Sequence, residues 1–87
     1  MSAMERNNVM CHGRPGGRPM VFAHGDGCDQ NMWRAVWPSF ADEHRIVLFD
    51  HVGYGGSDHA AYDPKRYDSL QAYADDVLAI LRELELE

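Results

Sequence analysis

The fold of this chain is decided by the stretch Val21-Phe22-Ala23-His24-Gly25-Asp26-Gly27-Cys28-Asp29-Gln30-Asn31-Met32-Trp33. The apolar run 20–23 has no polar alternation, which is typical of a strand covered on both faces in a parallel sheet. Gly25 and Gly27 permit a tight turn, and Asp29 can cap a helix that follows. The stretch therefore predicts a strand, a turn and a helix, the kind of corner at which ligands bind in α/β folds.

A second apolar run, 45–50, predicts another buried strand and completes a strand–helix–strand unit. The helix between the two strands is expected within 29–40, and Pro38 is expected to kink or end it. Its apolar side chains recur at spacings of one, three and four and should pack on the sheet: Met32, Trp33, Val36, Trp37 and Phe40.

The outer segments predict one more strand and one more helix. Residues 9–11 indicate an edge strand, and the breaker-rich segment 13–19 indicates a hairpin-like turn. Apolar residues recur at three and four over 70–84, which predicts an amphipathic helix with a capping box formed by Asp68 and Gln71. The expected class is α/β, with about three strands and two helices.

Composition limits the classes of protein to which the chain can belong. Its 87 residues form at most one domain, or a portion of one, and 14 acidic against 8 basic side chains argue against a nucleic-acid surface. No apolar run reaches the length of a membrane span, and the N-terminus lacks the apolar core of a signal peptide. With only two cysteines, the expected location is the reducing cytoplasm.

A dinucleotide-binding βαβ unit is one interpretation of the first corner. Gly25-x-Gly27-x-x-Gln30 matches half of the glycine fingerprint, and Asp50 ends the next strand where a ribose-binding acid belongs. Two features count against it. Gln30 replaces the third glycine, and the carboxylate of Asp26 would repel a pyrophosphate.

Two separated motifs favour a different interpretation. His24-Gly25-Asp26-Gly27 and the later Asp50-His51-Val52-Gly53-Tyr54-Gly55-Gly56-Ser57-Asp58 resemble two loops of the α/β-hydrolase superfamily. Residues 22–33, together with 67–78, resemble a closer group, the RsbQ-like hydrolases. These are bacterial stress-sigma-factor regulators related to plant strigolactone and karrikin receptors. The resemblance extends from about Arg6 onward and implies that 1–87 is the N-terminal portion of one hydrolase domain.

The resemblance implies a serine hydrolase that acts on a small ester or lactone-like substrate, needs no cofactor and has a possible signalling protein as partner. Such an enzyme uses a nucleophile elbow, then an acid, then a histidine, in chain order. Residues 1–87 contain no Gly-x-Ser-x-Gly, and Ser57 lies in the glycine loop. The family places the elbow just beyond the last helix, so this chain alone is expected to be inactive.

One catalytic group carries over by resemblance, the backbone N–H of Asp26 as an oxyanion-hole donor. The family commonly has Phe at this position, so the carboxylate of Asp26 is expected to slow a completed enzyme, and Asp26→Phe to raise its turnover. Loop-bracing roles are expected for His24, Gly25, Gly27, Asp50, Gly53 and Gly55.

Non-catalytic interpretations remain. The chain is alternatively a truncated product or an interaction module that self-associates through an exposed sheet edge. A zinc site formed by Cys11, His12, His24 and Cys28 lacks the paired spacing of a structural site, so no metal is expected. Cys28 is instead expected to be a small buried residue at the start of the helix.

Overall fold

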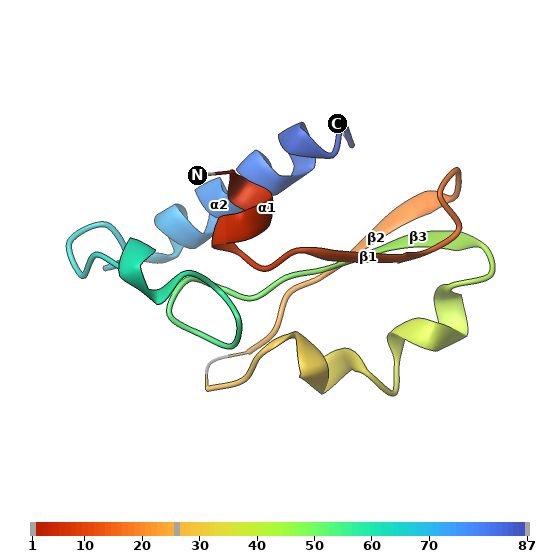
Figure 1. The fold of residues 1–87 in the computed structure, drawn as a ribbon, viewed down its shortest axis with the longest axis horizontal. Helices are drawn as coiled ribbons and strands as arrows, with labels where there is room; N and C mark the ends of the chain where they lie inside the picture. The colour runs from red at the N-terminus through yellow and green to blue at the C-terminus, as the bar shows by residue number, and fades with distance from the viewer. Residues whose placement is uncertain (1, 26, 87) are drawn as a thin grey trace.

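A computed structural model describes residues 2–25 and 27–86. Its sheet has three strands, β1 (Met10–Gly13), β2 (Arg18–Phe22) and β3 (His44–Leu48), in the order β1-β3-β2. β1 runs antiparallel to β3, and β2 runs parallel to it (Figure 1). The predicted α/β class with about three strands is confirmed.

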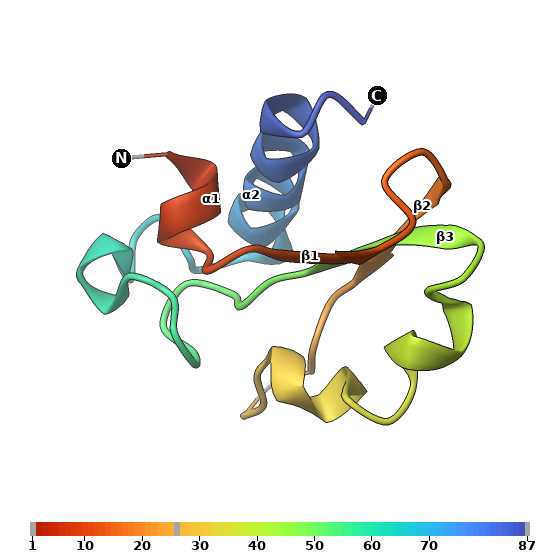
Figure 2. The same ribbon diagram turned by 45° about the vertical axis from the view of Figure 1, so that its right-hand side comes forward.

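The central strand β3 is buried on both faces, as its apolar run predicts. Ile46 and Leu48 pack against Phe22 on one face, and Val47 and Phe49 pack on the other. Helices α1 (Ala3–Arg6) and α2 (Leu70–Glu83) lie on one side of the sheet, while the short helices after β2 lie on the other (Figures 1 and 2).

The prediction for β2 is correct in position and wrong in burial. β2 lies at an edge of the sheet, and Val21 keeps 37% of its surface exposed. The turn predicted within 13–19 forms, with the N–H of Gly17 donating to the carbonyl of Arg14 at 2.9 Å. It does not close a hairpin, because β3 lies between β1 and β2. Gly13 sits so close to β3 that a Cβ there would be 2.3 Å from the carbonyl oxygen of His44.

The helix predicted within 29–40 is replaced by two 3-10 helices, η1 (Gln30–Trp33) and η2 (Trp37–Phe40). Asp29 caps η1 by accepting the N–H of Asn31 at 2.8 Å. Pro38 interrupts an α-helix here because it has no N–H and crowds the preceding turn. Trp33 and Trp37 pack on the sheet as predicted. Met32, Val36 and Phe40 are exposed instead, so the predicted apolar face is correct only in part.

Helix α2 is confirmed, but its predicted capping box is not. Ser69 occupies the cap position without a side-chain hydrogen bond, and Gln71 donates to Asp75 instead. The segment between β3 and α2 contains the short 3-10 helix η3 (His59–Ala61). Across 2–25 and 27–86, no helix is both long and apolar enough to cross a bilayer.

A buried carboxylate on α2 fastens α1 and the preceding loop to the core. The carboxylate of Asp76 lies 3.1 Å from the guanidinium of Arg6 and 2.9 Å from that of Arg66. Its second oxygen accepts the hydroxyl of Tyr67 at 2.7 Å. The N-terminal segment is therefore part of the folded unit.

Candidate active-site corner

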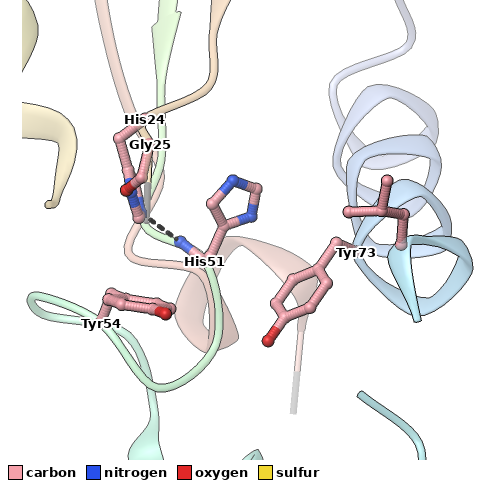
Figure 3. A pocket seen from close by; sticks show the side chains of 6 residues that line it. His24, Gly25, His51, Tyr54 and Tyr73 are labelled. Carbon is pink, nitrogen blue, oxygen red and sulfur yellow. Dashed lines mark hydrogen bonds between the residues drawn. The ribbon is translucent and has the colours of Figure 1, made fainter. Parts of the chain in front are cut away.

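β2 and β3 are parallel, so their carboxyl ends meet at one edge of the sheet, where both predicted glycine loops begin. A hollow of about 300 Å³ opens there beside α2. Figure 3 shows His24, Gly25, His51, Tyr54 and Tyr73 around it. The fold therefore brings the two motifs together.

His24 is buried, with 5% of its surface exposed, and both of its ring nitrogens have contacts. Nε2 accepts the backbone N–H of His51 at 2.9 Å (Figure 3). Nδ1 lies 2.8 Å from the carbonyl oxygen of Gly25, which places the ring proton on Nδ1. Because Nε2 already accepts a hydrogen bond, His24 has no spare lone pair with which to act as a general base.

Asp50 is 1% exposed and receives three N–H donors. Oδ1 accepts the backbone N–H of Gln30 at 2.8 Å. Oδ2 accepts the backbone N–H of Gly56 at 2.9 Å and the side-chain amide of Asn8 at 3.0 Å. Burial alone would raise the pKa of Asp50, but these hydrogen bonds outweigh it and hold the pKa below the usual aspartate value.

The pair Asn7 and Asn8 was missed by the sequence analysis. The backbone N–H of Asp50 donates to the carbonyl of Asn7 at 2.8 Å, and the buried Asn7 amide donates to the carbonyl of Asp50 at 2.9 Å. The side chain of Gln30 donates to the carbonyl of Asn8 at 2.8 Å. Asn8 has φ of 47°, a left-handed conformation that asparagine tolerates well, but an Asn-Asn pair alone does not indicate this role.

Two glycines of the second loop leave room for these side chains. A Cβ on Gly55 would lie 2.7 Å from Oδ2 of Asp50, and Gly55 also has φ of +52°. A Cβ on Gly56 would lie 2.5 Å from the amide nitrogen of Asn8. In the same loop, Gly53 has φ of +95°. A side chain at Gly55 would push Asp50 away, and one at Gly56 would push Asn8 away. The loop motif thus keeps glycine at the two positions that border the carboxylate and its donor.

Ser57 is buried inside the loop that it stabilises. Its hydroxyl donates to the carbonyl of Tyr54 at 2.6 Å and accepts the N–H groups of Gly53 and Tyr54 at 3.1 and 3.2 Å. A hydroxyl used in this way is not presented as a nucleophile.

His51 lies beside Asp50 and was not singled out from the sequence. Its ring lies 4.5 Å from that of His24, 5.1 Å from Phe49 and 5.3 Å from Tyr73, centroid to centroid. Burial, followed by the neighbouring His24, lowers the pKa of His51 below the usual histidine value. Burial beside His24 therefore favours the neutral ring of His51.

Some predicted residues lie outside this hydrogen-bonded cluster. A Cβ on Gly25 or Gly27 would meet no atom within 4 Å. Gly27 has a φ of +75°, a conformation that residues with a side chain rarely adopt. Asp26 lies outside the described residues. Cys28 is exposed, so its predicted burial is wrong, because no long helix forms there to cover it. Within the described ranges, no three His, Cys, Asp or Glu side chains gather as metal ligands do.

The profile of the alpha/beta hydrolase fold family matches residues 9–87. This chain belongs to that family. It is 42% identical to the Karrikin insensitive 2 receptor B of Petunia hybrida over 95% of this chain and 30% of the receptor. It is 40% identical to a strigolactone esterase of Pisum sativum over 91% of this chain and 29% of the esterase.

Among solved structures, a hydrolase from Oleispira antarctica superimposes on this family member with a TM-score of 0.86. The two are 44% identical, and the match covers 91% of this chain and 29% of the other. The chain thus spans about 30% of the length of the relatives it matches. The predicted resemblance to the group that includes strigolactone and karrikin receptors is confirmed.

The dinucleotide interpretation gains no support from the corner. Binding of a pyrophosphate needs the N-terminus of a helix directly after the glycine turn. In this α/β-hydrolase corner the turn leads into η1, a 3-10 helix of four residues.

Proposed function

We propose that this chain forms the N-terminal part of a serine hydrolase domain that acts on a small ester or lactone-like substrate. The observation that supports this most is the joining of two loops at the carboxyl ends of β2 and β3 through Asp50. Ligands of α/β sheets bind at this edge. Relatives named as a strigolactone esterase and a karrikin receptor favour the ester or lactone class.

In the proposed reaction, the backbone N–H of Asp26 stabilises the oxyanion of an acyl transfer. His24, Gly25, Gly27, Asp50, Gly53 and Gly55 hold the loops around it. The nucleophilic serine, the acid and the catalytic histidine belong to sequence beyond these 87 residues. Since the ring of His24 and the hydroxyl of Ser57 are already engaged in hydrogen bonds, residues 1–87 alone are proposed to be inactive.

A cytoplasmic location is proposed with this function. Both cysteines are free and exposed, which suits a reducing compartment. A signalling protein as partner remains part of the proposal because the relatives include receptors.

The mechanism is tested by joining residues 1–87 to the remaining part of the Oleispira antarctica hydrolase. A fluorophosphonate probe, which reacts with activated serines, should label this fusion once, as seen by intact mass. Exchange of the fusion's elbow serine for alanine should abolish labelling. Labelling of residues 1–87 alone at Ser57, or a folded fusion that the probe does not label, would contradict the proposal.

Self-association is the second candidate function. β2 is an edge strand, and both Val21 on it and Leu70 on α2 expose apolar surface. Such an edge can pair with another copy of the chain. Light scattering of residues 1–87 should then give a discrete dimer that Val21→Lys reduces to a monomer. A concentration-independent monomer would exclude this candidate.

A further inference from the structure

Three segments far apart in sequence converge on one carboxylate. Asn8 comes from the N-terminal segment, Gln30 from the loop after β2, and Gly56 from the loop after β3. Each donates an N–H to Asp50, at distances between 2.8 and 3.0 Å. The ion pairs seen among the described residues belong to Asp76, so N–H dipoles are what balance the charge of Asp50.

Each carboxylate oxygen of Asp50 binds a different loop. Oδ1 holds the loop after β2 through Gln30, whereas Oδ2 holds the loop after β3 through Gly56. Asn8 donates to Oδ2, and its own carbonyl accepts the side chain of Gln30. Asn8 therefore contacts the carboxylate and the first loop at the same time, which closes a ring of hydrogen bonds around Asp50.

From this geometry we propose that Asp50, completed by Asn8, is a positioning pair that sets the loop after β2 against the loop after β3. The inference rests on the proposed hydrolase function, because its consequence is the placement of the loop that carries the oxyanion donor. Neither residue touches substrate in this role. They act through the backbone, whose placement within a fraction of an ångström governs catalysis.

Asn8→Gly is the informative variant because glycine accepts the left-handed conformation of residue 8 without strain. It removes the amide donor and leaves the carbonyl that binds Gln30. Asp63→Asn is the matched control, since Asp63 is exposed and its carboxylate caps a turn away from Asp50.

The first measurement is an amide NMR titration of the full 87-residue chain from neutral to acidic pH. The amide protons of Gln30 and Gly56 should shift together, with one midpoint below the ordinary aspartate value of 3.8. Asn8→Gly should raise that midpoint by about 0.5–1 unit, since two or three such bonds lower a carboxyl pKa by about 2 units. Asp63→Asn should leave it unchanged.

Neighbouring ionisable groups are distinguished by their own signals in the same titration. They are Asp29, which lies against the same face of Gly55 as Asp50, and His51, the next residue in the chain. Amide exchange at neutral pH supplies a second readout, in which Asn8→Gly should speed exchange at Gln30 and Gly56 together. Separate midpoints for the two amides, or an Asn8→Gly chain that matches the wild type in both readouts, would overturn the positioning pair.

Activity is then measured in the fusion with the Oleispira antarctica hydrolase. Asn8→Gly should lower kcat by about 10-fold with KM unchanged, less than the roughly 10²–10³-fold expected for outright loss of an oxyanion donor. Coupled amides in an inactive fusion would sink the hydrolase proposal and leave the positioning pair standing. An active fusion in which the amides of Gln30 and Gly56 titrate separately would overturn the positioning pair and leave the hydrolase proposal standing.

Discussion

Nε2 of His24 accepts the backbone N–H of His51 at 2.9 Å, so a side chain that follows β2 satisfies the main chain that follows β3. Nδ1 contacts the carbonyl of Gly25 at 2.8 Å. The ring of His24 therefore connects the loop after β2 to the loop after β3 and stabilises both. A histidine in a His-Gly motif invites a catalytic interpretation, and here its hydrogen bonds exclude the role of a base.

His24→Ala should lower the free energy of unfolding by about 1–3 kcal/mol, because it leaves the part-buried N–H of His51 without its acceptor. Urea denaturation measures the loss, and amide exchange at His51 should accelerate in parallel. His59→Ala is the control, since His59 is exposed and its removal should cost less than about 0.5 kcal/mol. Equal costs for the two variants would contradict the bracing role.

Gly55→Ala should lower the free energy of unfolding by more than about 1 kcal/mol. Alanine is strained at the left-handed φ of residue 55, and its Cβ would clash with the carboxylate of Asp50. Gly16→Ala provides the comparison, since a Cβ at Gly16 meets nothing within 4 Å. Thermal unfolding of the two variants should separate them clearly. Tolerance of alanine at 55 would mean that the second loop does not hold Asp50 as described.

Asp76→Asn should cost about 2–3 kcal/mol of unfolding free energy, and Tyr67→Phe about 1.5 kcal/mol, because both lose hydrogen bonds to a buried carboxylate. The double variant should cost less than the sum, since the two changes remove a shared contact. Arg66→Ala should cost less than about 1 kcal/mol because that side chain is half exposed. Strict additivity in urea denaturation would refute a direct bond.

Stability should fall with acidification in two stages. The pKa values of His51 and Asp50 are both lowered on folding, so the folded state binds fewer protons and loses stability as pH falls. The first loss begins as pH drops below 6.5, the ordinary value for His51, and the second below 3.8, the ordinary value for Asp50. His51→Phe should remove the first stage from a pH series of urea midpoints and preserve the second. A single stage in the wild-type chain would argue against this assignment.

If the backbone N–H of Asp26 is the oxyanion donor, as proposed, Asp26→Phe in the fusion should raise ester turnover because it removes a negative charge from that position. The gain can reach about 10²–10³-fold, the usual worth of one oxyanion donor. Asp26→Asn separates charge from bulk, and it should recover part of the gain. Unchanged turnover in both variants would show that the side chain does not influence the reaction.

Uninterrupted apolar runs and regular spacing predicted the positions of β3 and α2 correctly, and β3 is buried as expected. The buried residues of α2 are Ala72, Asp76 and Ile80, whereas Leu70 and Leu78 of the apolar repeat are exposed. The apolar spacing within 29–40 predicted one α-helix, and this prediction was wrong. Pro38 lacks the N–H that a continuous helix needs, so two short 3-10 helices form instead. Asp50 was expected to brace its loop, as its bond from Gly56 does, and the structure adds donors from Asn8 and Gln30. Such long-range partners leave no local pattern, so only the fold reveals them.

The most direct test of the central claim is the initial rate of p-nitrophenyl acetate hydrolysis by the fusion, beside residues 1–87 alone. We predict saturable turnover by the fusion, its loss when the elbow serine is exchanged for alanine, and a background rate for residues 1–87. A folded fusion without turnover, or equal rates for the fusion and residues 1–87, would contradict the assignment of this chain to the oxyanion side of a serine hydrolase.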